Sequence, residues 1–376
     1  MKSLAGFCGL LLLAACIPQA SSRSVEAPPP PVRTADESRA VPPQPIATEV
    51  RRTPPAPRIV PAVETASRIL DARLAQLARN FDGDVGIAVH DIQRDWTSHY
   101  QGHNFYPQQS VSKLWVALTA FDKADRGELD LRQRVTVRRD DLTLFHQPIR
   151  AAVLNGGFSS TLDDLVFRAI TQSDNTANDF VLWRAGGPEA VRATLRRKGI
   201  QGIRFGPGER VMQSRIAGLE WNPSYSLGRN FYTARANVPA SRRRSAFESY
   251  IADPVDGATP TAMVEALARL KRGELLSPAA TSRMLGAMSS TRTGPRRLKG
   301  GLAPGWRLAH KTGTGQVYGS TQAGYNDVGI LTAPDGRSYA VAVLIGRTSR
   351  PVPERMELMQ QVSRAVIDYV ENMKGR

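Results

Sequence analysis

Three short strings, Ser110-Val111-Ser112-Lys113, Ser173-Asp174-Asn175 and Lys311-Thr312-Gly313, occur in this order along the chain. An S-x-x-K string alone carries little information, because a chain of this length holds roughly one copy by chance. Each of the other two strings is expected at well under ~0.2 copies. Here S-x-x-K occurs once, since no other lysine has a serine three residues before it. The ordered set therefore indicates an active-site serine enzyme.

The spacing of Ser110 and Lys113 suits nucleophilic catalysis. A serine hydroxyl is a weak nucleophile until a neighbouring base removes its proton. Apolar residues at helical spacing follow Ser110, so we expect it at a helix start with Lys113 one turn along on the same side. A lysine that is partly desolvated and near other cations can act as the base. The alternative, an ordinary surface serine and lysine on an amphipathic helix, is disfavoured by the two other strings.

The composition permits a sizeable core and argues against a nucleic-acid partner. The chain has 376 residues, 41% of them hydrophobic, which is enough for one large or two modest domains. Its net charge of +16 would fit nucleic-acid binding. Arginine outnumbers lysine throughout, however, and no basic stripe with interleaved aromatics is present. We therefore expect no nucleic-acid partner and attribute the charge to a genomic arginine bias, with attraction to an anionic envelope surface left open.

The N-terminus has the pattern of an export signal. Met1-Lys2 forms a short charged region, and residues 10–15 form an apolar core ending in small residues, too short to span a bilayer permanently. The string Leu13-Ala14-Ala15-Cys16 resembles a bacterial lipoprotein cleavage box. We expect residues 1–15 to be removed as a signal peptide and Cys16 to be lipidated. A plain signal peptide with an incidental cysteine is the alternative.

Residues 16–61 are expected to form a disordered tether. Repeated proline pairs interrupt any helix, and few aromatic residues are present to build a core. Together with lipidation at Cys16, this predicts a protein anchored to a membrane in the bacterial periplasm or cell envelope.

Beyond the tether, the hydrophobic pattern predicts an α/β fold. Helical patterns cover residues 62–80, 163–170, 177–184, 188–198, 260–270 and 353–373. Strand patterns cover residues 85–89, 96–100, 307–312, 327–332 and 339–345. The first and last segments, 62–107 and 300–376, are therefore expected to build one α/β part, and residues 108–299 a helical part.

Over roughly residues 62–373, the chain with these strings resembles the class A β-lactamases. The resemblance implies a β-lactamase/transpeptidase-like α/β fold, in which an antiparallel sheet is flanked by helices and joined to an all-α layer. It implies one catalytic domain over residues 62–376. It also implies hydrolysis of the β-lactam amide through an acyl-enzyme on Ser110.

Class A members are distinguished within their superfamily by a glutamate in the Ω loop, which directs water onto the acyl-enzyme. The corresponding position, 36 residues after Ser173, is Glu209. This role requires a carboxylate beside a water near the ester carbon. Glu220 is a rival base at a poorer spacing, and a solvated loop glutamate is the non-functional alternative.

Two departures from the family pattern bear on deacylation. Gln213 stands where the family usually has an asparagine that helps to hold the water. Asp179 stands where the family usually has an asparagine facing the Ω loop. A second carboxylate near Glu209 predicts like-charge repulsion, or a proton shared between the two groups.

The resemblance assigns further roles residue by residue. Ser173 would relay a proton to the leaving nitrogen, and Asn175 would hold the side-chain amide of the substrate. The backbone N–H groups of Ser110 and Thr314 would form the oxyanion hole. The substrate carboxylate would be bound from a strand edge, with support from an arginine 14 residues before the K-T-G string; these residues are Lys311, Thr312, Thr314 and Arg297.

Other features allow more than one interpretation. Phe145 lies where the family often has an aromatic at the edge of the site, and a core phenylalanine is equally expected. The segment 221–253 makes the chain longer than the family pattern; a solvated loop is favoured over a cover for the site or a contact with an anionic surface. We expect neither a metal nor a cofactor, because the histidines lack metal-ligand spacing: His90, His103, His146 and His310.

Two other functions stay open. One is an envelope D,D-peptidase or esterase that is acylated by β-lactams and turns them over slowly, against which Glu209 argues. The other is a non-catalytic binding module on the same fold, against which the intact Ser110, Lys113 and Lys311 argue. The expected partners are a small-molecule β-lactam and, through the lipid anchor, a membrane; the chain is expected to be a monomer.

Overall fold

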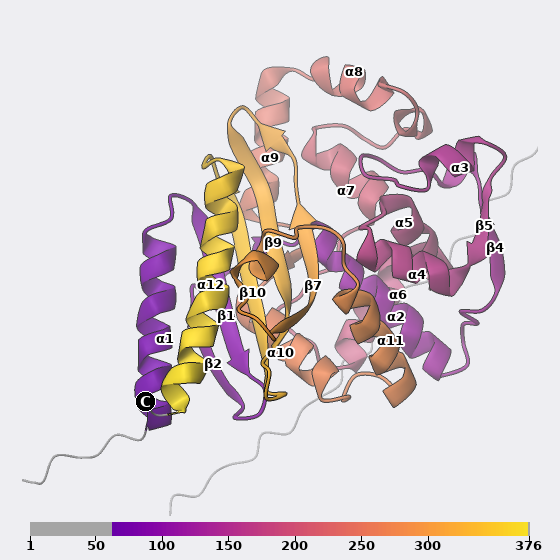
Figure 1. Cartoon of the computed structure of the whole chain (residues 1–376). Helices are drawn as coiled ribbons and strands as arrows, with labels where there is room; N and C mark the ends of the chain where they lie inside the picture. Colours follow the sequence, from indigo (N-terminus) through magenta and orange to yellow (C-terminus); the bar gives the residue numbers. More distant parts are fainter. Residues whose placement is uncertain (1–61, 375–376) are drawn as a thin grey trace, which may run out of the picture. The chain divides into compact units, whose positions relative to one another are not determined.

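The computed structural model describes residues 62–374 (Figure 1). The expected signal peptide, the lipidation at Cys16 and the tether lie outside the described residues. Within the described part, no helix combines the length and the apolar character needed to cross a membrane.

One antiparallel sheet organises the α/β part. Among the described residues its six strands follow the order β2-β1-β10-β9-β7, with β8 paired to β9. Their bounds are β1 Asp84–Asp91, β2 Trp96–Tyr100, β7 Arg307–Thr314, β8 Val317–Tyr318, β9 Thr321–Thr332 and β10 Ser338–Thr348. Because β1 pairs with β10, the beginning and the end of the described chain share one sheet, as the sequence predicted. The strand β7, which carries the K-T-G string, lies at the sheet edge.

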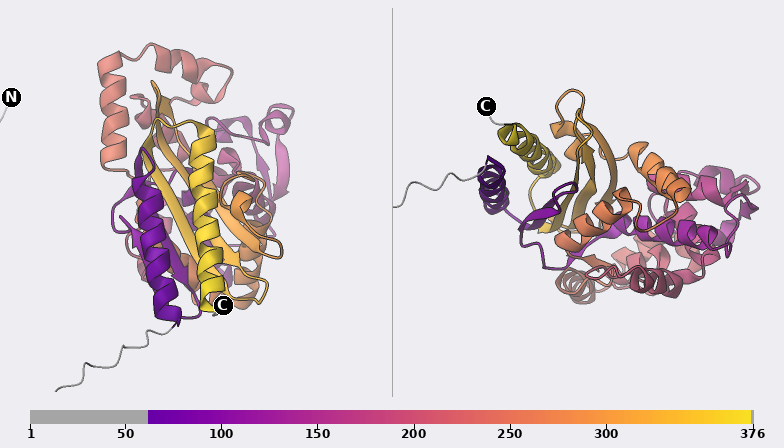
Figure 2. Two further views of the ribbon diagram at one scale, coloured as in Figure 1. Left: turned by 60° about the vertical axis from the view of Figure 1, so that its left-hand side comes forward. Right: turned by 90° about the horizontal axis from the view of Figure 1, so that it is seen from below.

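The two terminal helices cover one face of the sheet. These helices are α1 (Ala62–Arg79) and α12 (Val352–Met373), which lie next to each other in both views of Figure 2. Side chains alternate between faces along a strand. On β10, Val341 and Val343 therefore join the apolar cluster with α1 and α12, whereas Ala342 joins the cluster on the opposite face.

The opposite face is covered by α10 (Pro260–Lys271), which packs on β1, β9 and β10. This differs from the expectation that residues 108–299 all belong to a helical part. The physical reason is the buried stripe of α10, which includes Met263 and Leu267 and joins the same cluster as Leu344 of β10.

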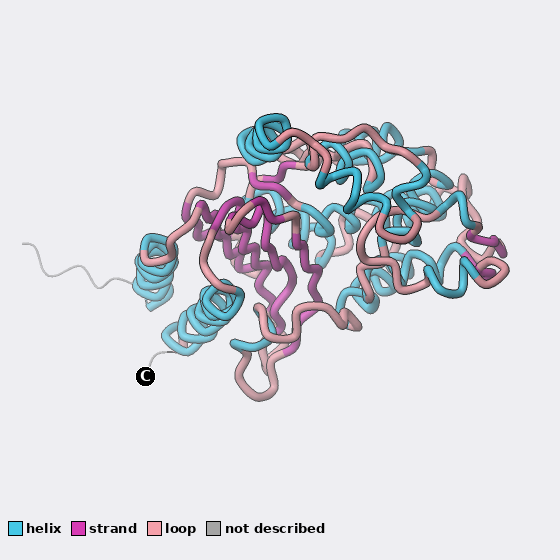
Figure 3. The backbone as a smooth tube through the Cα atoms, turned by 90° about the horizontal axis from the view of Figure 1, so that it is seen from above, coloured by secondary structure: helices cyan, strands magenta, loops and turns pink. Residues whose placement is uncertain are grey.

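The remaining helices form the second part of the fold, beside the sheet (Figure 3). Their centre is α2, whose residues from Lys113 to Asp122 are all buried. Two short ribbons, β3 with β6 and β4 with β5, were not predicted. The bounds are α2 Lys113–Asp125, α3 Arg150–Leu154, α4 Leu162–Thr171, α5 Asn175–Arg184, α6 Gly187–Arg197, α7 Glu209–Ile216, α8 Asn230–Ala236, α9 Ala240–Ala252, α11 Pro278–Ser289, β3 Tyr106–Pro107, β4 Arg134–Val137, β5 Phe158–Thr161 and β6 Gly257–Ala258. Short 3₁₀ turns cover Gln109–Ser112, Arg139–Asp141, Pro223–Ser226 and Leu298–Gly301.

The segment 221–253 is largely helical, so the expectation of a solvated loop is wrong. It contains α8 and α9. The physical reason is that each helix buries an aromatic side chain against the rest of the fold. Phe231 of α8 joins a cluster with Leu144, and Phe247 of α9 joins a cluster with Met212.

The sheet core should be sensitive to the loss of volume. Leu344 is fully buried on the face of β10 that α10 covers. Leu344→Ala should therefore lower the free energy of unfolding by about 2–5 kcal/mol. Urea unfolding followed by circular dichroism measures this. The control Val317→Ala changes a side chain that is 45% exposed and should stay within about 0.5 kcal/mol of the parent. Equal losses in both variants would contradict this packing.

Candidate active site

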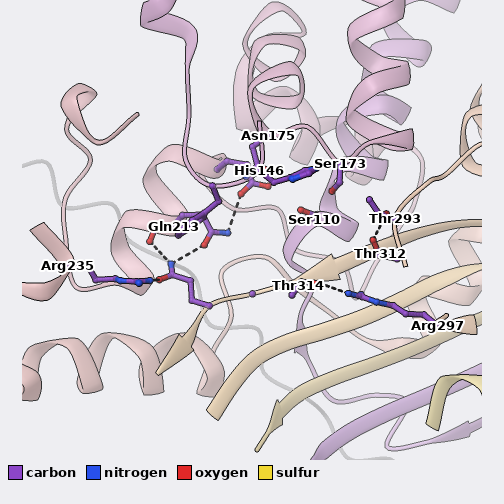
Figure 4. Close-up of a pocket in the computed structure, with 14 residues that line it drawn as sticks. Ser110, His146, Ser173, Asn175, Gln213, Arg235, Thr293, Arg297, Thr312 and Thr314 are labelled. Atoms are coloured by element: carbon purple, nitrogen blue, oxygen red, sulfur yellow. Dashed lines mark hydrogen bonds between the residues drawn. The ribbon is translucent and has the colours of Figure 1, made fainter. Parts of the chain in front are cut away.

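A pocket of about 350 Å³ lies where the edge strand β7 meets the helical part (Figure 4). Most residues that the sequence predicted for the site line this pocket: Ser110, Phe145, Ser173, Asn175, Glu209, Gln213, Arg297, Thr312 and Thr314. The two predicted lysines, Lys113 and Lys311, are fully buried, and each donates a hydrogen bond to a serine of the lining. The structure thus brings together strings that lie up to 200 residues apart in the sequence.

Ser110 lies in the 3₁₀ turn that leads into α2, one turn before the position expected for it. The residue before it, Gln109, has a φ of +53°. A left-handed conformation is costly for a residue with a side chain, so packing must hold this turn. Lys113 begins α2, and its Nζ donates to Ser110 Oγ at 2.8 Å.

Glu209 begins α7 and connects to this pair. Lys113 Nζ also donates to Glu209 Oε1. Gln213, one turn further along α7, donates from Nε2 to Glu209 Oε2 at 3.2 Å. The nucleophile, the buried ammonium, the carboxylate and the amide therefore form one continuous hydrogen-bonded chain along the pocket.

Asp179 acts on the backbone of Glu209. Its Oδ1 accepts from Glu209 N at 3.1 Å and its Oδ2 from Arg210 N at 3.3 Å, so it caps the start of α7 from helix α5. Burial, and then the charge of Glu209, raises the pKa of Asp179 to about 6. The second carboxylate expected near Glu209 is therefore present, and its hydrogen bonds hold the backbone of the helix that carries Glu209.

The second serine, Ser173, is held by Lys311. Lys311 Nζ donates to Ser173 Oγ at 2.8 Å and to Thr312 O at 2.9 Å. Burial, with the positive charges of Lys113 and Arg297 nearby, lowers the pKa of Lys311 well below its usual value. Ser173 has a φ of +58°, and the following Asp174 caps α5 by accepting from Ala177 N at 2.9 Å.

Asn175 offers an acceptor to the pocket. Its Nδ2 donates to Leu144 O at 2.8 Å, which sets the orientation of the amide. Its Oδ1 is buried and has no hydrogen-bond partner among residues 62–374. This oxygen can accept a hydrogen bond from an N–H group of a bound ligand. It is therefore suited to hold a side-chain amide of that ligand.

Arg297 lies against β7 at another side of the pocket. Its guanidinium donates to Gly313 O at 3.0 Å, to Asn326 O at 2.6 Å and to Thr314 Oγ1 at 2.6 Å. It also stacks 3.8 Å from the ring centre of Tyr325. Arg297 therefore fixes the Thr314 hydroxyl and places positive charge beside the strand edge where a carboxylate was expected to bind.

Two other expectations are resolved by the geometry. Phe145 lines the pocket and is 37% exposed, so it is an edge residue and not a core residue. Glu220 is exposed, lies 3.7 Å from Arg215 and is absent from the pocket lining, so the rival base is far less well placed than Glu209.

The histidines have local contacts that their spacing did not reveal. His310 Nδ1 lies 2.8 Å from Asp327 Oδ1, and His146 lines the pocket with its Nε2 2.8 Å from Gln172 O. His90 lies within 4.8 Å of carboxylates, with Nε2 3.4 Å from Asp95 Oδ1. Arg272 pairs with both carboxylates of that group, those of Asp95 and Glu265.

A buried polar group behind the nucleophile was not predicted from the sequence. Asp256 accepts from Gln109 N at 2.7 Å and from the Tyr250 hydroxyl at 3.0 Å, and Tyr250 in turn accepts from Gln109 Nε2 at 2.5 Å. Burial raises the pKa of Asp256 to about 7. No string signals these contacts, because Gln109 and Asp256 are 147 residues apart. Arg235 and Gln316, which also line the pocket, were missed for the same reason.

A sequence model of the β-lactamase enzyme family matches residues 69–370. The chain therefore belongs to the β-lactamase enzyme family. It is 24% identical to β-lactamase VEB-1 of Pseudomonas aeruginosa over 306 residues, which cover 81% of this chain and 91% of that protein.

Solved structures agree with this assignment. The crystal structure of a β-lactamase from Chitinophaga pinensis has a TM-score of 0.66 at 25% identity, over 80% of this chain and 99% of that one. An ancestral class A β-lactamase has a TM-score of 0.62 at 28% identity, over 79% and 98%. The predicted fold and the prediction of a class A β-lactamase-like serine hydrolase are confirmed. Lipidation, the periplasmic location and the roles of single residues stay predictions.

Lys311 should be required for efficient turnover. Lys311→Ala removes the hydrogen bond to Ser173 and a positive charge behind the pocket, so kcat/KM for a chromogenic cephalosporin should fall at least ~10-fold, which equals ~1.4 kcal/mol. The control Lys299→Ala alters an exposed lysine and should leave kcat/KM unchanged. A normal rate in Lys311→Ala would show that this lysine does not serve the site.

Asp179 should influence the pH dependence of deacylation. Above pH 6 its carboxylate is ionised and repels that of Glu209, and Asp179→Asn removes this charge. The limb of the deacylation rate near pH 6 that follows the ionisation of Asp179 should therefore be lost in this variant. Stopped-flow turnover between pH 4 and 8 measures the limb. The exposed Asp82→Asn should leave it in place, and an unmoved limb in both variants would contradict the coupling.

Proposed function

We propose that this protein hydrolyses β-lactams through an acyl-enzyme on Ser110, with Glu209 activating the deacylating water. The observation that carries the proposal is the hydrogen-bonded chain from Ser110 Oγ through Lys113 Nζ to Glu209 Oε1, on a pocket that also holds Ser173. Membership of the β-lactamase enzyme family supports the same chemistry.

Acylation uses the two serine–lysine pairs. Lys113, as the neutral amine, takes the proton of Ser110 Oγ, which attacks the lactam carbonyl carbon. The backbone N–H groups of Ser110 and Thr314 stabilise the oxyanion. The lactam C–N bond then breaks, Ser173 donates a proton to the leaving nitrogen, and Lys113 returns the proton of Ser110 to Ser173. Lys311, bonded to Ser173 Oγ at 2.8 Å, orients that hydroxyl and stabilises its charge.

Deacylation uses the other end of the same chain. Glu209, as the carboxylate, takes a proton from a water that attacks the ester carbon, and this proton passes to Ser110 Oγ as the ester C–O bond breaks. Gln213 donates to Glu209 Oε2 and so fixes the carboxylate, and its amide takes the part of the asparagine usual in class A enzymes. Asp179 holds the start of α7 and thereby the position of Glu209.

Substrate binding follows from the polar lining. The β-lactam carboxylate binds at the edge of β7, between Thr312, Thr314 and the positive charge of Arg297. The unpartnered Oδ1 of Asn175 accepts from the side-chain amide N–H of the substrate. Phe145 packs against the acyl side chain at the rim.

The cellular setting is part of the same proposal. Residues 1–15 act as a signal peptide, and Cys16 carries a lipid that anchors a monomer in the bacterial envelope, as the cleavage-box pattern supports. The segment 221–253, with α8 and α9, is an enlargement relative to the class A pattern.

Glu209 should govern deacylation and not acylation. Glu209→Gln keeps the shape and removes the base, so the variant should form the acyl-enzyme with benzylpenicillin and release it slowly. Intact-protein mass spectrometry should show the adduct accumulating, and it should map to a peptide that contains Ser110. The matched control Glu220→Gln changes an exposed glutamate and should turn over at the parent rate.

The opposite results would overturn this assignment. An adduct that persists in Ser110→Ala would show that another residue is acylated. Fast turnover by Glu209→Gln would show that a different base activates the water. A parent enzyme that itself remains acylated for hours would place the protein with the slow-hydrolysing D,D-peptidases.

A further inference from the structure

Helix α8 brings a cation to the pocket. Arg235 of α8 lines the same pocket as Ser110, and its Nη1 donates to Gln316 Oε1 at 3.3 Å. In Figure 4, Arg235 and Arg297 point toward the pocket from opposite sides, and Ser110 and Thr314 lie between them. The pocket therefore has a positive charge at each of two separated ends.

The position of Arg235 is fixed by aromatic packing. Phe231, one turn earlier on α8, is buried and meets Phe145 edge to face at 5.2 Å between ring centres. The guanidinium of Arg235 lies 5.6 Å from the ring centre of Phe231 and 5.3 Å from that of Tyr232. The aromatic rings hold the cation in place and shield it in part from water.

Arg235 has no anionic partner in the described part of the chain. None of the ion pairs between residues 62 and 374 includes it, and its hydrogen-bond partner Gln316 is neutral. The positive charge of Arg243 acts on the guanidinium of Arg235. Burial and this like charge lower the pKa of Arg235, although a guanidinium remains protonated at neutral pH.

A partly desolvated cation without a counter-ion is costly, and an anion at the pocket would offset that cost. Under the proposed function, the carboxylate common to β-lactams binds at the Arg297 end. An anion for Arg235 must then come from another part of the ligand. The acyl side chain is that part, because it extends past Asn175 and Phe145, and Phe145 contacts α8.

We propose that Arg235 forms a subsite for β-lactams whose acyl side chain carries a second carboxylate. The inference rests on the proposed function, and it names a substrate class for the same pocket. A guanidinium binds a carboxylate through charge-assisted, often bidentate hydrogen bonds, so the subsite selects dianionic over monoanionic substrates.

Two penicillins test this directly, because carbenicillin differs from benzylpenicillin by one carboxylate on the side-chain carbon next to the amide. The measured quantity is the ratio of kcat/KM for carbenicillin to that for benzylpenicillin. In Arg235→Gln this ratio should fall by roughly 10- to 100-fold, the loss expected for a hydrogen bond between charged groups. In Arg235→Lys, which keeps the charge, it should recover in part.

Arg244→Gln is the matched control, because it removes the same net charge from an exposed arginine on α9 that does not line the pocket. Its ratio should equal that of the parent. An equal fall for Arg244→Gln would show a general effect of net charge and overturn the subsite.

The outcomes separate this inference from the proposed function. A parent enzyme that hydrolyses neither penicillin would overturn the proposed function itself. Turnover of benzylpenicillin together with an unchanged ratio in Arg235→Gln would overturn only the subsite. A loss that is equal for both penicillins would also overturn it, because a purely structural role of Arg235 does not discriminate between them.

Discussion

The site depends on one buried ammonium group. Lys113 is fully buried, and burying a charge without partners costs several kcal/mol. Its Nζ donates hydrogen bonds to Ser110, in the turn just before α2, and to Glu209 at the start of α7. Helix α7 must therefore dock where its first residue reaches α2. The same contact that stabilises this docking also sets the nucleophile and the carboxylate at working distance, so folding and catalysis place the same demand on these residues.

Much of the fold could be predicted because its elements have simple patterns. The strands β1 and β10 are mostly apolar and lie near the two ends of the described chain, and the K-T-G string marks β7. The prediction cut β9 short at Asp327, because the strand begins with buried polar side chains, among them Gln322 and Asn326. These side chains form hydrogen bonds with distant parts of the chain; for example, Asn326 Nδ2 donates to Pro107 O at 2.7 Å. A hydrophobicity pattern gives no sign of such contacts.

The site was predictable as far as its strings extend. The three motifs contain the two serines and the two lysines, and the resemblance to class A β-lactamases pointed to Glu209, which accepts a hydrogen bond from Lys113. Side-chain pairs made by the tertiary fold could not be found this way. The resemblance placed Asp179 near Glu209 but gave no sign of its hydrogen bonds to backbone N–H groups 30 and 31 residues away, and the contact of Arg235 with Gln316, across 81 residues, was missed. Neither contact has a sequence signature, since each depends on how separate segments of the chain dock.

The contact of Asp256 with Gln109 limits how this protein can diversify. The segment of α8 and α9 begins after α7, which carries Glu209, and leads through Tyr250 to Asp256, and these two residues hold the residue before Ser110. Both ends are therefore tied to the reacting groups, whereas Arg235, in the stretch between them, lines the pocket without contacting Ser110, Lys113 or Glu209. Mutations in that stretch can alter which molecules are admitted without disturbing the nucleophile. In evolutionary terms, the segment lies between two anchors that serve the chemistry, and new substrate preferences can be selected there at little cost to it.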